Sequence, residues 1–250
     1  MFGLEPWQLA VVSAAICFGG MVKGITGIGL PIVTISVLVN FFDPLFALAV
    51  VIIPILVTNF WQAFRLGLYW SALRRFGPMI ACFLVLLLVS ARLVVELDTQ
   101  ALFGVMGVTV TVFAVSNLAK PRRRAIRPAT ERWAGPLAGG LGGLLGGMTT
   151  IWGPPMMMYF MLLKLDKDTW VRVVGLVWFL GSLPLTYAYW DNGVFTAERI
   201  PISAFACLPG MAGILIGEHL RRYIDQDTFA KVLLGALLLI GLNLIRRAVF

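Results

Sequence analysis

Residues 19–31 carry the pattern that decides the fold of this chain. They read Gly19-Gly20-Met21-Val22-Lys23-Gly24-Ile25-Thr26-Gly27-Ile28-Gly29-Leu30-Pro31. Residues 142–154 follow 123 positions later, without a gap, and read Gly142-Gly143-Leu144-Leu145-Gly146-Gly147-Met148-Thr149-Thr150-Ile151-Trp152-Gly153-Pro154. The identical pairs are Gly19 with Gly142, Gly20 with Gly143, Gly24 with Gly147, Thr26 with Thr149, Ile28 with Ile151, and Pro31 with Pro154. The chain therefore holds two copies of one glycine-rich unit that ends in proline.

The two copies divide the chain into halves at residues 1–119 and 133–250. A basic linker, residues 120–132, joins them. The offset of 123 also pairs Asp43 with Asp166, and Asp98-Thr99 resembles Asp227-Thr228. An aspartate before an apolar run is a good helix start, because its carboxylate accepts from free backbone N–H groups. We therefore expect Asp98 and Asp227 each to cap a long apolar helix.

The composition is that of a membrane protein. Of the 250 residues, 60% are hydrophobic and 13% are charged, whereas soluble domains hold about 45–50% apolar and about 25% charged residues. The apolar residues fall in long runs, such as 76–95 and 101–119. Each run is close to the roughly 20 residues that a helix needs to cross a bilayer. The sequence predicts an all-α integral membrane protein with seven or eight apolar segments.

The net charge of +8 does not indicate nucleic-acid binding. The basic residues gather in short loops between apolar runs, which is the positive-inside pattern of a multi-pass protein of the cytoplasmic (inner) membrane. This pattern places the linker and residues 65–75 inside, and residues 40–44 and 96–98 outside. The N-terminus has no basic start and is expected to stay attached, on the outer side.

The order of the segments suggests how the halves are related. If each glycine-rich unit turns back as a hairpin, each half has three further transmembrane helices. The odd number gives the halves opposite orientations, as in the inverted repeats of many secondary transporters. This version leaves Arg246 and Arg247 outside. If the units instead cross fully, each half has four crossings and the repeat is parallel.

The glycine-rich units are poor helix formers. Glycine costs about 1 kcal/mol in a helix interior and proline about 3 kcal/mol. We therefore expect the helix before each unit to stop near its glycines, and a short helix to begin with Pro31 or with Pro154 and Pro155. Irregular backbone within a membrane must be buried in protein, so the two tips are expected to meet near the midplane. The alternative is that the glycines only allow close helix packing.

The expected meeting point has the chemistry of an oxyanion site. Helix N-termini offer free N–H groups and a positive dipole end, and a lysine at membrane depth indicates function, unless it reaches a surface. Asn59 and Gln62, three apart on one helix face, are expected to line the path. The candidate binding residues are Lys23, Gly24, Thr26, Gly27, Gly29, Pro31, Asn59, Gln62, Thr149, Thr150, Trp152, Gly153 and Pro154.

Nothing in the sequence predicts an enzyme, a metal site or a cofactor. Three cysteines lie in separate apolar segments, without ligand spacing, and the chain has one histidine, His219. No nucleophile and base form a recognisable set, and neither glycine run carries a nucleotide-binding Gly-Lys-Ser/Thr.

At residues 19–31 and 142–155 the chain resembles the sulfite exporter TauE/SafE family, also called the toluene-sulfonate uptake permease family. The resemblance extends over the whole chain in length and layout, and its second copy departs from the family pattern at Thr150, Ile151 and Trp152. It implies a secondary transporter of sulfite or an organosulfonate such as sulfoacetate or isethionate. A lipid environment, a homodimer and coupling to protons or sodium are compatible with this interpretation. An anion channel or a membrane assembly factor is the alternative.

Overall fold

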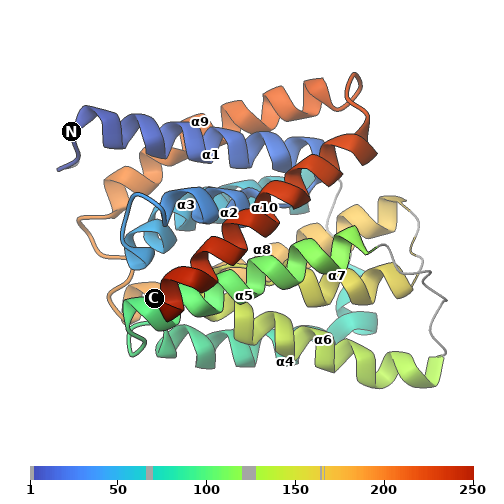
Figure 1. Cartoon of the computed structure of the whole chain (residues 1–250). Helices are drawn as coiled ribbons and strands as arrows, with labels where there is room; N and C mark the ends of the chain where they lie inside the picture. The colour runs from blue at the N-terminus through green and yellow to red at the C-terminus, as the bar shows by residue number, and fades with distance from the viewer. Residues whose placement is uncertain (1–2, 66–69, 120–127, 164, 166) are drawn as a thin grey trace.

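The computed structural model describes residues 3–65, 70–119, 128–163, 165 and 167–250. Within these residues the chain is helical and contains no strand. The helices are α1 (Pro6–Thr26), α2 (Leu30–Leu38), α3 (Pro44–Arg65), α4 (Trp70–Leu93), α5 (Thr99–Leu118), α6 (Pro128–Thr149), α7 (Gly153–Leu162), α8 (Lys167–Asp191), α9 (Ile200–Leu220) and α10 (Gln226–Val249). Figure 1 shows them as one elongated bundle with both chain termini at the same end.

Seven of the described helices are long and apolar enough to cross a membrane: α1, α3, α4, α5, α8, α9 and α10. Large apolar side chains stay exposed on several of them, including Val85, Val89, Val108, Val112, Leu239 and Leu242. Such broad apolar surface is unsuited to water and suited to lipid. The prediction of an all-α membrane protein with seven or eight apolar segments is confirmed.

Helices α2 and α7 turn back instead of crossing. α2 has 9 residues and α7 has 10, or about 14–15 Å at 1.5 Å per residue, half of the ~30 Å hydrocarbon layer. α2 packs back along α1, where Thr34 Oγ1 donates to the carbonyl of Ala15 at 3.4 Å. α7 packs back along α6, where a Cβ on Gly142 would lie 3.0 Å from the Met156 side chain. Of the two alternatives, a glycine-rich unit that turns back as a hairpin and one that crosses fully, the structure has the hairpin.

Each helix ends within its glycine-rich unit, as predicted, but it ends later in that unit than the low helix propensity of glycine indicates. α1 continues through Gly19, Gly20 and Gly24 to Thr26, and α6 continues through its glycines to Thr149. The breaks are only three residues long, 27–29 in the first half and 150–152 in the second. We call these segments the first break and the second break.

Close helix packing explains why the glycines remain helical. A Cβ on Gly20 or Gly24 would overlap a backbone carbonyl of α9, and a Cβ on Gly139 or Gly143 would overlap one of α4. Small residues let membrane helices approach to backbone contact, and the packing gained outweighs the low helix propensity of glycine. The packing alternative is therefore correct for most of these glycines.

The helix pairings repeat between the halves. α1 pairs with α9 in the same way that α6 pairs with α4, and α5 and α10, which hold equivalent places in the two halves, lie side by side. α3 and α8 also hold equivalent places and pack against each other. This exchange of partners fits the predicted inverted relation of the halves, which stays a prediction.

Of the two predicted helix caps, Asp98 is confirmed and Asp227 is not. Asp98 caps α5, where its carboxylate accepts from the N–H of Ala101 at 2.7 Å, as expected. α10 is capped by Asp225, which accepts from the N–H of Thr228 at 3.0 Å; the prediction of Asp227 was wrong because α10 begins earlier. α6 begins at Pro128, inside the segment assigned to the linker. Residues 120–127 and Asp166 lie outside the described residues.

Arg247, one of the two arginines near the C-terminus, contacts the end of α2. Arg247 Nη1 donates to the carbonyl of Val39 at 2.8 Å, and its guanidinium lies 4.1 Å from the centroid of the Phe103 ring. A cation at a helix C-terminus satisfies free carbonyls and interacts favourably with the helix dipole. The C-terminus therefore lies beside residues 39–40, on the end that the charge pattern predicts to be outside.

Ser203 donates a hydrogen bond to a carbonyl of α3 that a proline leaves without its helical partner, and removal of this hydroxyl should destabilise the fold. Pro54 has no N–H, so the carbonyl of Val50 lacks its helical partner, and Ser203 Oγ donates to it at 3.0 Å. We expect Ser203→Ala to lower the free energy of unfolding by about 1–3 kcal/mol, because the Val50 carbonyl loses this donor and the N–H of Ile53 loses Ser203 Oγ as its acceptor. Thermal melting in detergent measures this. Ser13 bonds within its own helix, to Leu9 at 2.8 Å, so Ser13→Ala is the control; equal melting temperatures would contradict the argument.

Candidate functional site

The two breaks meet at one small cavity inside the bundle. Its volume is ≈ 40 Å³, enough for one to a few water-sized groups. Residues from both halves line it: Lys23, Ile28, Gly29, Pro31, Ile32, Asn59, Phe113, Thr150, Ile151, Trp152, Gly153, Pro154 and Trp178. Pieces of chain separated by 123 residues thus face the same space. We call it the small cavity.

Lys23 projects from α1 into this region. Its side chain is only 7% exposed, so it does not reach a surface as the snorkelling alternative requires. Nζ donates to Asn59 Oδ1 at 2.6 Å and to Thr58 Oγ1 at 3.0 Å. An ammonium has three N–H donors, so one remains unused, and Lys23 has no ion pair among the described residues. Such a site favours an anionic partner.

Asn59 fixes the orientation of this amine. Its Oδ1 accepts from Lys23, and its Nδ2 donates to the carbonyl of Trp178 in α8 at 3.3 Å. One amide therefore connects α1, α3 and α8. Because the amide nitrogen is already used, Asn59 presents an acceptor to the lysine and holds it beside the small cavity.

Both short helices begin at the small cavity with a proline in the first turn, as predicted. α2 starts at Leu30 with Pro31 next, and α7 starts at Gly153 with Pro154 next. The first-turn N–H groups of a helix have no partner within it, and they carry partial positive charge. The two helix starts and Lys23 therefore give this space a positive potential.

The paired threonines stabilise the breaks. Thr26 Oγ1 donates to the carbonyl of Val22 at 2.8 Å, and the equivalent Thr149 Oγ1 donates to that of Leu145 at 2.6 Å. Each hydroxyl also accepts from the N–H two residues later, at Ile28 and Ile151. Thr26 lines the larger cavity described below, whereas the linings of both cavities omit Thr149.

The breaks turn through the same backbone conformation with different residues. Gly27 has φ 83°, and Thr150, its equivalent 123 positions later, has φ 59°. Positive φ suits glycine and strains a β-branched residue, at a cost of about 1–3 kcal/mol. Beside it, Trp152 is buried and packs edge-on against Phe83 and Trp178, with ring centroids 5.8 and 6.4 Å away.

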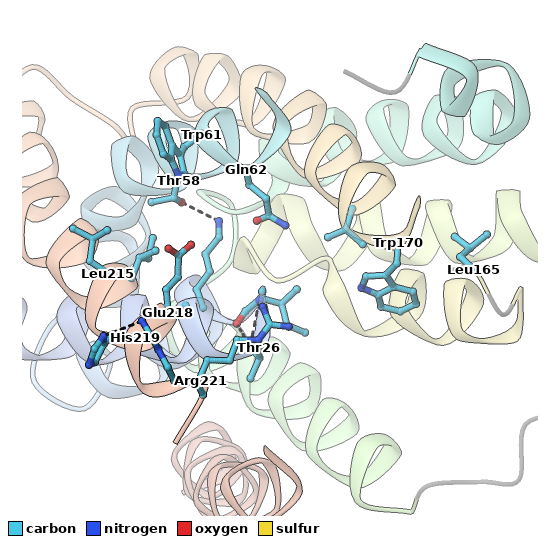
Figure 2. A pocket seen from close by; sticks show the side chains of 17 residues that line it. Thr26, Thr58, Trp61, Gln62, Leu165, Trp170, Leu215, Glu218, His219 and Arg221 are labelled. Carbon is cyan, nitrogen blue, oxygen red and sulfur yellow. Dashed lines mark hydrogen bonds between the residues drawn. The ribbon is translucent and has the colours of Figure 1, made fainter. Parts of the chain in front are cut away.

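A larger cavity, which we call the vestibule, adjoins the small cavity. Its volume is ≈ 1000 Å³, and Figure 2 shows Thr58, Gln62, Glu218 and Trp170 around it, with Arg221 nearby. Lys23 and Ile28 line both cavities. The described lining residues are Lys23, Gly24, Thr26, Gly27, Ile28, Thr58, Trp61, Gln62, Leu165, Trp170, Val174, Ile214, Leu215, Glu218, His219, Arg221 and Arg222.

The charges of the vestibule favour anions. Among the described lining residues, Lys23, Arg221 and Arg222 are cations and Glu218 is a carboxylate. A concave wall with an excess of one sign raises the local concentration of the opposite ion. The vestibule therefore forms a basic route that ends at the buried amine of Lys23.

The structure brings most of the predicted binding residues to these two cavities. Gly24, Thr26, Gly27 and Gln62 line the vestibule, Lys23 lines both cavities, and the others except Thr149 line the small cavity. Sequence reasoning missed Thr58, although it stands next to Asn59. The candidate set also lacked Trp61, Trp170, Arg221 and Arg222, because residue type alone does not show what a side chain faces.

Comparison with known proteins agrees with this architecture. The family model described as sulfite exporter TauE/SafE matches residues 12–244. The chain belongs to the TauE/SafE family. No curated protein and no solved structure matches the chain.

TauE/SafE membership defines the function at a general level. The family implies a membrane transporter of sulfite or related anions, and the seven span-length helices fit a multi-pass membrane protein. The TauE/SafE match includes both breaks, Lys23 and every residue that lines the two cavities.

Proposed function

We propose that this protein is a secondary transporter that binds a small sulfur-containing oxyanion, sulfite or an organosulfonate such as sulfoacetate or isethionate, between its two breaks. Lys23 is the cationic ligand, and N–H groups at the starts of α2 and α7 are further donors. The other members of the predicted set position these groups or shape the two cavities. The protein acts in the cytoplasmic membrane, without a cofactor.

The observation that carries the proposal is the environment of Lys23. The ammonium of Lys23 is 7% exposed and, among the described residues, bonds only to neutral oxygens. Such a charge is costly in an apolar interior. A bound anion compensates this charge directly, and its oxygens accept from the unused N–H. The small cavity next to it contains no Asp or Glu in its described lining, so nothing there repels an anion.

The two cavities support alternating access as the mechanism. The vestibule gives the site a route toward the end of the bundle where Arg221 and Arg222 lie. The rings of Trp152 and Trp178, which pack edge-on against each other, form part of the wall of the small cavity. We infer that rocking of one half against the other about the paired breaks opens the site to the second side.

Ligand-induced stabilisation tests the site. The purified protein is melted in detergent with sulfite, thiosulfate, isethionate, sulfoacetate, taurine, sulfate, phosphate or acetate. A ligand at 100 times its Kd adds about 2.7 kcal/mol, so at least one sulfur oxyanion should raise the melting temperature by several degrees. If every anion of the panel leaves a folded protein unshifted, the proposed binding site is wrong.

Transport itself is tested in proteoliposomes. Vesicles loaded with the unlabelled anion should accumulate the labelled anion transiently from outside, because a carrier that alternates exchanges one for the other. A channel gives no such counterflow, and an assembly factor gives no flux at all. Flux without counterflow would therefore indicate a channel, and the absence of flux would indicate an assembly factor; either result would contradict alternating access.

A further inference from the structure

The second break contains a residue that the fold does not require. Thr150 is the sole non-glycine residue with positive φ in the described part of the chain. The remaining described residues with positive φ are glycines: Gly3, Gly27, Gly29 and Gly193. The equivalent Gly27 shows that glycine serves this turn in the same protein. A β-branched residue in the left-handed region is strained, and such outliers gather at functional sites.

The side chain of Thr150 adds a second unfavourable feature. Thr150 is fully buried, and its Oγ1 has no hydrogen-bond partner among the described residues. The neighbouring Thr149 hydroxyl is satisfied within the backbone. Buried hydroxyl groups are rarely left unpaired, and each exception needs an explanation.

The position of Thr150 supplies that explanation. Thr150 lines the small cavity together with Lys23, which reaches it from the first half. Among the described residues, one N–H donor of Lys23 and the O–H donor of Thr150 have no acceptor. Two unused donors from different halves around a cavity for one small group match the several acceptor oxygens of an oxyanion.

We propose that the Thr150 hydroxyl is a direct substrate ligand that donates to an oxygen of the anion bound at Lys23. This assignment rests on the proposed function and adds a contact from the second half. The residue lowers the stability of the empty protein and raises its affinity for the anion. The site is therefore asymmetric: the first half contributes the charge, and the second half contributes the hydroxyl.

Three substitutions separate the hydroxyl from the backbone strain. Thr150→Val keeps the shape and the strain and removes the hydroxyl, Thr150→Ser keeps the hydroxyl, and Thr150→Gly removes both. Melting of the empty protein and calorimetric titration with sulfite and with isethionate are measured for each. We expect Val and Gly to weaken the Kd about 10-fold or more, as for loss of a hydrogen bond to a charged group, and Ser to stay within about threefold. The empty Gly variant should melt higher than wild type.

The outcomes distinguish this assignment from the proposed function. If wild type binds and Lys23→Met does not, while Thr150→Val binds as tightly as wild type, only the Thr150 ligand is wrong. If wild type binds neither anion, the site and the Thr150 ligand fail together. A lower melting temperature of empty Thr150→Gly would overturn the strain argument, because it would mean that the threonine stabilises the break.

Discussion

Lys23→Met should abolish anion binding and transport while the protein still folds. Methionine has a similar length and no charge, so α1 keeps its packing and the anion loses its cationic ligand. Truncating one partner of a buried charged pair costs about 2–5 kcal/mol, or roughly 30-fold to several thousand-fold in Kd. Without Lys23, the side-chain oxygens of Asn59 and Thr58 lose this donor. Both residues line cavities with room for water, which limits the effect on stability.

The measurement is the anion-induced rise in melting temperature, together with counterflow in proteoliposomes. Lys231 is exposed on α10, away from both cavity linings, so Lys231→Met is the matched control and should bind and transport like wild type. An unchanged Kd in folded Lys23→Met would show that the buried amine has a purely structural role, and the proposed site would then be wrong.

Gly143→Leu should prevent the protein from folding. A Cβ on Gly143 would overlap the carbonyl oxygen of Phe83 and lie 2.9 Å from the backbone nitrogen of Leu87. Both atoms belong to the backbone of α4, so no side chain can move aside, and α4 and α6 must separate. Overpacking in a core costs about 1–3 kcal/mol, occasionally more, even for small additions; a leucine here adds four carbons against a helix.

The control for this variant is a glycine in open surroundings. A Cβ on Gly235 in α10 would meet no atom within 4 Å. Gly235→Leu and Gly235→Ala should therefore fold, with alanine stabilising α10 by up to about 1 kcal/mol through helix propensity, whereas Gly143→Ala should destabilise. Size-exclusion profiles and melting temperatures in detergent measure the difference. If both positions respond alike, propensity and not packing governs these glycines.

The glycine positions show where reasoning from the sequence succeeded and where it failed. The two proline-led helices and their meeting at one cavity follow from local rules, because proline is restricted to the first helical turn and irregular backbone avoids lipid. The extent of the breaks did not follow. Gly20 and Gly24 are helical because the backbone of α9, almost 200 residues away in the chain, packs directly against them. Helix propensity does not include packing against a distant helix.

The binding region shows the same division. Lys23 stands out in the sequence because a charge within an apolar segment is costly. Thr58 does not stand out in the sequence, because a threonine in a membrane helix commonly bonds within its own helix. Thr109, for example, donates to the carbonyl of Val105. Only the fold turns Thr58 toward Lys23 and leaves the hydroxyl of Thr150 without a partner.

The sequence by itself determined the membrane class, the two-fold repeat and the position of the short helices, since each depends on composition or on neighbours within a few residues. The tertiary structure decided which glycines pack and which turn, that α2 and α7 turn back, and which polar atoms face the cavities. These features depend on contacts between segments far apart in the chain. Their energies come from packing and from buried hydrogen bonds, which a local pattern does not specify.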